Sequence, residues 1–137
     1  MILFNRIDSM PLYILFLRVS FGSLMLLHGM GKLFDLIRMN TSFFENFDPF
    51  GIGGLMMLVL AVFSEFVCSL LVIAGLCTRL ALIPLISSMA VAFFLFHASD
   101  DLPKKEAVLL YMIGFIFLML SGPGKYSVDK WKQSKTD

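Results

Sequence analysis

The stretch LYILFLRVSFGSLMLLHGMGKLF, residues 12–34, decides the fold of this chain. Its first two thirds are dominated by Leu, Ile, Phe, Val and Met, as in a helix that crosses a bilayer. Three ionisable residues interrupt it: Arg18, His28 and Lys32. An ionisable group at bilayer depth costs roughly 2.5–3.5 kcal/mol on insertion scales, so it faces protein or a polar cavity rather than lipid. We therefore expect a spanning helix whose charged side marks a functional site.

Helical periodicity places these charges together with glycines on one face. At 100° per residue, this face spans about 80° and carries Arg18, Gly22, Met25, Gly29 and Lys32, with His28 to one side. The opposite face carries only apolar side chains and one serine. The charged face is therefore expected to point into the protein, where each charge needs a partner.

The composition is that of a membrane protein. Hydrophobic residues make up 58% of the 137 residues, against about 45–50% in soluble domains. The net charge of +1 leaves no basic footprint for nucleic acid, so the lipid bilayer is the expected partner. The first apolar run is too long for the core of a cleavable signal peptide and no Ala-x-Ala site follows it, so we expect it to remain as the first span.

We expect one all-α membrane domain over residues 1–137, an integral membrane four-helix bundle. An amphipathic insert, residues 38–50, separates the first two spans, because its phenylalanines recur at spacings of three and four. The turn at Thr78-Arg79 is short, which makes the second and third spans antiparallel neighbours. The four spans are expected at about residues 10–33, 55–76, 80–97 and 106–121.

The ends of the chain carry helix signals. The first span is expected to begin near Ser9 or Met10, with Pro11 in its first turn. Gly122-Pro123-Gly124 ends the last span, and Ser127 can cap a short turn over residues 128–131. A disordered basic tail is expected to follow, within a cytoplasmic segment 125–137.

Four spans put both termini on one side of the membrane. That side carries six basic residues, and the other carries four basic residues diluted by five acidic ones. The positive-inside rule therefore places both termini in the cytoplasm, and we expect a multi-pass protein of the bacterial inner membrane.

The two cysteines, Cys68 and Cys77, are nine residues apart and lack a CxxC spacing. On one helix they would point to opposite faces, which argues against a redox dithiol. We expect both to be small buried residues.

Glu65, near the middle of the second span, is the natural partner for Arg18. Three interpretations of such a pair remain open: a buried ion pair that fixes the helix register, the wall of a pocket for an anionic or quinone-like head group, and a proton relay. A paired carboxylate can ionise at this depth, whereas an isolated one stays protonated.

Further ionisable residues gather at the outer end. His28 and His97 lie on the same side of the membrane, so a metal or haem pair is geometrically possible, although packing or loop roles are more common for single histidines. Glu106 begins the last span, where it can act as a helix cap or pair with Lys32. No set of metal ligands is evident, and we expect no metal site.

The ordered set of these residues resembles the DoxX family of small four-span bacterial membrane proteins. The resemblance rests on Arg18-x3-Gly22, His28-Gly29-x2-Lys32-Leu33-Phe34, Glu65, Gly75-Leu76-x-Thr78-Arg79, Glu106 and Gly122-Pro123-Gly124-Lys125-Tyr126-Ser127-x-Asp129. It implies a four-helix membrane bundle and a loose association with redox chemistry, including likeness to a membrane subunit of a thiosulfate:quinone oxidoreductase. Relatives with a CxxC pair perform dithiol chemistry, and this chain lacks that pair.

We therefore expect one inward pocket that binds a quinone-like ligand. Its expected ligand-binding residues are Arg18, His28, Lys32, Glu65 and Glu106. The sequence carries no recognisable cofactor motif, and a quinone is the possible cofactor. Electrons would therefore come from a soluble or membrane redox partner. The alternative is a non-enzymatic scaffold, chaperone or assembly factor whose charged core is structural. Solute transport is less favoured because the two halves show no repeat, and a homo-oligomer remains open.

Overall fold

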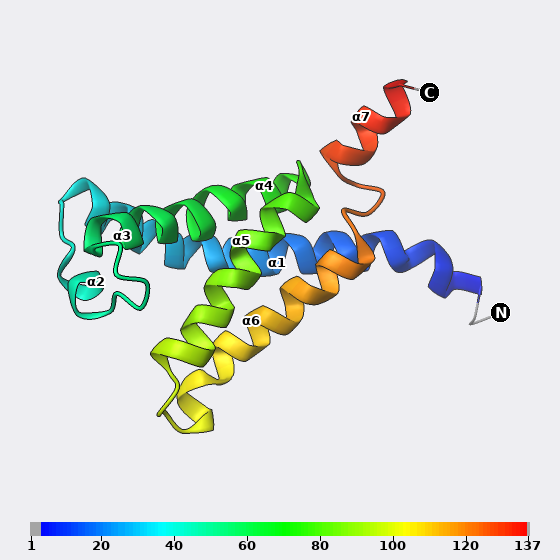
Figure 1. Cartoon of the computed structure of the whole chain (residues 1–137). Coiled ribbons are helices and arrows are strands. Elements are labelled where there is room, and N and C mark those ends of the chain that lie inside the picture. Colours follow the sequence, from blue (N-terminus) through cyan, green and yellow to red (C-terminus); the bar gives the residue numbers. More distant parts are fainter. Residues whose placement is uncertain (1–3, 137) are drawn as a thin grey trace.

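The computed structural model describes the backbone of residues 4–136 and the side chains of residues 10–136. It confirms an all-α architecture with an insert between the first two long helices (Figure 1). The elements are α1 (Phe4–Ile37), α2 (Ser42–Asn46), α3 (Gly54–Val62), η1 (Phe63–Val67), α4 (Cys68–Ala74), α5 (Thr78–Val91), η2 (Ala92–Phe96), α6 (Leu102–Ser121) and α7 (Val128–Thr136).

The long helices form two antiparallel pairs. One continuous rod, α3–η1–α4, packs along α1, and α6 packs along α5. The two pairs meet near the turn between α4 and α5, and they diverge toward the end where α2 lies (Figure 1). Because the pairs spread apart at that end, space for a cavity opens between them.

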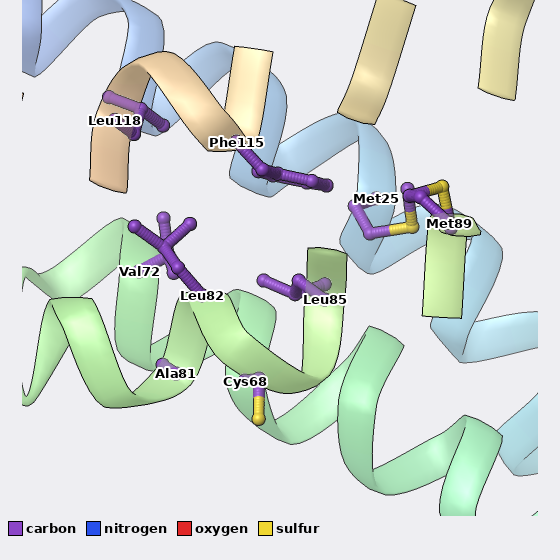
Figure 2. Close-up of a cluster of buried hydrophobic side chains, with 9 residues drawn as sticks. All are labelled: Met25, Cys68, Val72, Ala81, Leu82, Leu85, Met89, Phe115 and Leu118. Atoms are coloured by element: carbon purple, nitrogen blue, oxygen red, sulfur yellow. The ribbon is translucent and has the colours of Figure 1, made fainter. Parts of the chain in front are cut away.

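One buried cluster packs the end of the bundle where the two helix pairs meet, which we call the closed end. Its nine side chains come from α1, α4, α5 and α6, and Figure 2 shows Val72, Leu82 and Leu85 pointing toward Phe115 and Leu118. A second cluster joins Phe44 of α2 to Met57, Leu58 and Val62. The insert therefore packs its buried phenylalanine on α3 and caps one end of the bundle.

Within the described residues, three segments are long and apolar enough to cross a membrane: Met10–Ile37, Gly54–Ala74 and Thr78–Phe96. The fourth expected span lies in α6, whose 20 residues would rise about 30 Å. Lys104, Lys105 and Glu106 stand in its first two turns. Three segments thus support a membrane bundle, and the crossing by α6 stays a prediction.

The structure corrects two expected helix ends. The first helix begins at Phe4, so Pro11 lies inside it rather than in its first turn. A proline there removes only one backbone hydrogen bond, which a 34-residue helix can tolerate. The expected disordered tail is wrong for most of its length, because α7 continues to Thr136. Its predicted cap is confirmed: the Lys130 N–H donates to Oγ of Ser127 at 3.2 Å.

Candidate functional site

Gly29 sets how closely α1 approaches η1. A Cβ atom at this position would lie 2.5 Å from the backbone carbon and oxygen of Glu65, so only glycine fits there. Lys32 follows on α1 about one turn later. The close backbone contact therefore brings the amine of Lys32 beside the carboxylate of Glu65.

Lys32 and Glu65 form a partly buried ion pair, in which the Lys32 side chain is 30% exposed. Nζ of Lys32 lies 2.5 Å from both carboxylate oxygens, and the Glu65 side chain is only 5% exposed. Ser88 of α5 donates from its hydroxyl to Oε1 of Glu65 at 3.1 Å. Three helical segments thus contribute to one charged cluster, and a buried carboxylate with these donors is satisfied.

The expected pairing of Arg18 with Glu65 is wrong, because Lys32 pairs with Glu65. Of the two roles left open for Glu106, neither is formed: it does not pair with Lys32, and Asp101 stands at the N-cap of α6. Glu65 lies opposite Gly29, whereas Arg18 lies opposite Gly75, near the other end of the rod. Glu106 is exposed on α6. It occupies the fifth position of that helix, because α6 begins at Leu102 rather than at the expected start.

The ion pair lies in the wall of a cavity of about 680 Å³ between the two helix pairs. Most of the lining is apolar and aromatic, from α1, α2, α3, α5 and α6. Of the five residues expected to bind a ligand, His28, Lys32 and Glu65 line it, whereas Arg18 and Glu106 do not. Met25 and Met89 belong both to the core cluster and to the lining, so the packed core ends where the cavity begins.

Both histidines also line the cavity. Nδ1 of His28 donates to the Leu24 carbonyl at 3.0 Å, which leaves Nε2 as an acceptor. Nδ1 of His97 lies 2.7 Å from Oδ2 of Asp100, and this hydrogen bond lowers the pKa of the Asp100 carboxyl. Among the described residues, no three His, Cys, Asp or Glu side chains are grouped as metal ligands.

Two π-helical segments border the cavity, and no pattern in the sequence predicted either. η1 carries Glu65, and η2 carries Phe96. Short π-helical segments within α-helices occur frequently at functional sites. Neither segment contains a proline or a glycine, so no helix-breaking residue marks it in the sequence.

Aromatic side chains of the insert reach across one end of the cavity. Phe43 and Phe47 lie 5.3 and 5.0 Å, between ring centroids, from Phe96 of η2. These contacts join the α1–α3 side to the α5–α6 side where the two pairs diverge. The insert therefore partly covers the cavity in addition to capping the bundle.

Arg18 has a different role at the closed end. Its side chain is buried, with a residue exposure of 2%. The guanidinium donates to the Pro123 carbonyl and, at 2.6 Å, to the Tyr126 carbonyl. Arg18 therefore fixes residues 122–129, which we call the closing segment, against the bundle.

Gly75 makes room for this contact. It ends α4 in the left-handed conformation, with φ of +71°, which glycine adopts without strain. A Cβ atom there would also lie 2.6 Å from Cβ of Ser127 and 2.9 Å from Cζ of Arg18. The turn, the arginine and the closing segment thus pack as one unit.

Asp129 joins the closing segment to the start of α5. Its carboxylate accepts hydrogen bonds from the backbone N–H groups of Cys77 and Thr78, at 2.7 and 2.9 Å, and from the Thr78 hydroxyl. Partial desolvation raises the pKa of Asp129, but these donors and nearby Lys132 outweigh it and hold the pKa below its usual value. Asp129 therefore caps α5 from a distant part of the chain.

Replacing Asp129 by alanine should lower the free energy of unfolding at pH 7 by about 1–2 kcal/mol, because α5 loses its cap. Since folding depresses this pKa, the stabilisation is present above the ordinary aspartate pKa and is lost as the pH falls through the folded value. Detergent-micelle unfolding should thus show a difference at pH 7 that shrinks on acidification. Asp101→Ala is the control, because Asp101 precedes α6 without a side-chain cap hydrogen bond.

The cysteines differ from expectation in one respect. Cys68 is buried in the core cluster as expected, but Cys77 is exposed. It does not share a helix with Cys68, because it lies in the turn before α5 with a positive φ of 48°. Both are free thiols.

Comparisons with known proteins agree with these observations. The family model described as DoxX matches residues 13–98, which run from α1 through η2. An uncharacterized protein of Haemophilus influenzae is 32% identical over 127 residues, covering 87% of this chain and 90% of its own length. An uncharacterized membrane protein of Mycobacterium tuberculosis is 34% identical over 80 residues, about half of each chain.

No solved structure matches this chain. The family match covers more than half of the sequence, and the Haemophilus relative aligns over nearly the whole of it. The three segments able to span a membrane agree with the description of the Mycobacterium relative as a membrane protein. The chain therefore belongs to the DoxX family of membrane proteins.

Proposed function

We propose that this protein binds a small apolar molecule with a polar head, of the quinone class, in the cavity beside Lys32 and Glu65. The supporting observation is a cavity of about 680 Å³ that is mainly apolar and carries an ion pair with a buried carboxylate. Known ligand sites are of similar size, about 300–1,000 Å³, and combine an apolar lining with few polar groups.

The polar groups of the lining fit a quinone or quinol head group. The Lys32 ammonium can donate to a head-group oxygen, and Nε2 of His28 can accept from a quinol hydroxyl; both residues line the cavity. The phenylalanines and methionines of the lining suit an isoprenoid tail. When bound, a quinone supplies a two-electron acceptor.

The residues of this chain would bind, orient and exchange protons rather than carry electrons. Lys32 can donate a hydrogen bond to a head-group oxygen, and Glu65, held by Ser88, keeps the ammonium in place. The aromatic contacts of the insert with Phe96 limit access of water at one end. In this proposal the protein is the quinone-facing membrane subunit of a redox complex, and a partner protein supplies the electrons.

We also propose that the protein resides in the bacterial inner membrane with both termini in the cytoplasm. The six basic residues on the terminal side support this orientation, since cytoplasmic loops carry the excess of Lys and Arg. Reporter fusions at both termini test this proposal, and an active periplasmic reporter would contradict it.

The double variant Lys32→Gln/Glu65→Gln should weaken binding of decylubiquinone about tenfold. It removes both charges together, so neither is left buried without a partner. Binding is measured by equilibrium titration of purified protein in nanodiscs. Glu106→Gln is the matched control, because Glu106 is exposed and lies outside the lining.

A second variant, Ala107→Phe, tests the cavity without changing the ion pair. Ala107 lines the cavity and is exposed, so a larger side chain should fill space without disturbing the core. Unchanged affinity in both variants would refute quinone binding at this site. If neither the wild type nor the variants showed saturable quinone binding, and the protein still retained a protein partner, the scaffold function would be supported instead.

A further inference from the structure

A second cleft lies at the opposite end of the bundle from the cavity. It has a volume of about 1,070 Å³ and lies between the start of α5, the end of α6 and α7. Arg79, Lys125, Lys130 and Lys132 line it, and Asp129 is the acidic residue among its lining. Four basic side chains against one carboxylate give the lining a net charge of +3, and the Asp129 carboxylate is directed at the backbone N–H groups of Cys77 and Thr78.

The cleft is at the level where the long helices end. α5 begins at Thr78 and α6 ends at Ser121, so this level is a membrane–water boundary if both helices span. Two cleft-adjacent leucines face outward beside the basic groups: Leu80 is 69% exposed and Leu120 is 76% exposed. A cationic hollow next to exposed apolar surface matches a phosphate head group with its acyl chains.

One of these cations lies against the closing segment. A Cβ atom at Gly122 would lie 3.3 Å from Nη2 of Arg79, so the guanidinium rests over the glycine turn. Guanidinium groups bind phosphate through two parallel N–H bonds. Arg79 is thus positioned at the edge of the cleft beside three flexible lysines.

We propose that this cleft binds the head group of one anionic phospholipid. The charge of the cleft complements a phosphodiester, and the exposed leucines continue from it along the lipid-facing surface. A lipid explains both features together, whereas a soluble anion would use only the basic groups. This proposal is independent of the ligand in the cavity between the helix pairs.

Native mass spectrometry tests the proposal with phosphatidylglycerol and phosphatidylcholine of identical acyl chains, offered together to detergent-purified protein. We expect phosphatidylglycerol to be retained preferentially, and Arg79→Gln/Lys132→Gln to reduce that preference at least about fivefold. The control Lys104→Gln/Lys105→Gln removes the same charge at the other end of α6 and should retain the preference. Equal thermal unfolding midpoints in phosphatidylcholine would show that the cleft variant is folded.

The single tryptophan offers a second readout, because Trp131 stands on α7 between two of the cleft lysines. Energy transfer from Trp131 to dansyl-labelled phosphatidylglycerol should exceed transfer to a neutral dansyl lipid, and the cleft variant should remove the excess. A preference that survives the cleft variant would overturn the proposal. So would displacement of the lipid by millimolar inorganic phosphate, which would identify a site for soluble anions.

Discussion

Replacing Gly29 by alanine should destabilise the protein by about 3 kcal/mol, the upper part of the usual range for overpacking. The added methyl group would lie 2.5 Å from backbone atoms of Glu65 and 2.6 Å from N of Phe66. Backbone atoms cannot rotate away as a side chain can, so α1 and η1 must separate. Separation would also lengthen the contact between Lys32 and Glu65, and quinone binding should therefore weaken along with stability.

Gly31 provides a matched control two residues away in the same helix. A Cβ atom at Gly31 meets nothing within 4 Å. Gly31→Ala should be neutral or stabilising by up to about 1 kcal/mol, because alanine has a higher helix propensity than glycine. Unfolding in mixed micelles measures both variants. Equal stabilities of the two alanine variants would contradict the close contact between α1 and η1.

The contrast between these glycines shows what the sequence could and could not predict. Hydrophobic runs and turn residues were enough to predict the long helices and the insert, since these signals are local. Helical periodicity placed Gly29, but not Gly31, on the face expected to point into the protein. The sequence could not show that the Glu65 backbone lies opposite Gly29, because that contact depends on the register of a neighbouring helix.

The same limit explains the wrong partner for Arg18. Both Arg18 and Glu65 lie within apolar runs, which fixes their depth only roughly. The 16-residue connection between Ile37 and Gly54 leaves the register of the two helices open by several residues. In the structure the register moves Glu65 opposite Gly29, so Lys32 becomes its partner and Arg18 meets the closing segment.

Three of the five expected ligand-binding residues share the cavity, and the reason is again helical geometry. His28 and Lys32 are four residues apart on α1, so they lie on adjacent turns of one side. Glu106 was assigned from its place at the start of a span, but α6 begins four residues earlier and leaves it exposed. The serine that holds Glu65, Ser88, carried no signal, since single serines within apolar helices are common.

Replacing Arg18 by methionine should lower the free energy of unfolding by about 3 kcal/mol. Methionine has a similar length but donates no hydrogen bond, so the carbonyls of Pro123 and Tyr126 lose a charged donor. Hydrogen bonds to charged groups contribute about 1.5–3 kcal/mol each. The free energy of unfolding of Arg18→Lys should lie between those of the wild type and Arg18→Met, because one ammonium does not reproduce the planar fork of a guanidinium.

Release of the closing segment gives a second, local readout of the same variant. Trypsin should cleave after Lys125 faster in Arg18→Met than in the wild type, because the segment is no longer fixed to the bundle. Arg38→Met is the control, since Arg38 is exposed just beyond the end of α1. Mass spectrometry of the fragments measures the rates.

This experiment also separates the two roles that a buried arginine in a spanning helix can have. If Arg18 bound the ligand, its loss would abolish quinone binding and leave the closing segment protected. The structure predicts the reverse: the segment becomes cleavable, and binding in the folded fraction is retained, because Arg18 does not line the cavity. Arg18 thus holds the closing segment against the bundle, whereas the proposed ligand site lies around Lys32 and Glu65, where the two helix pairs diverge.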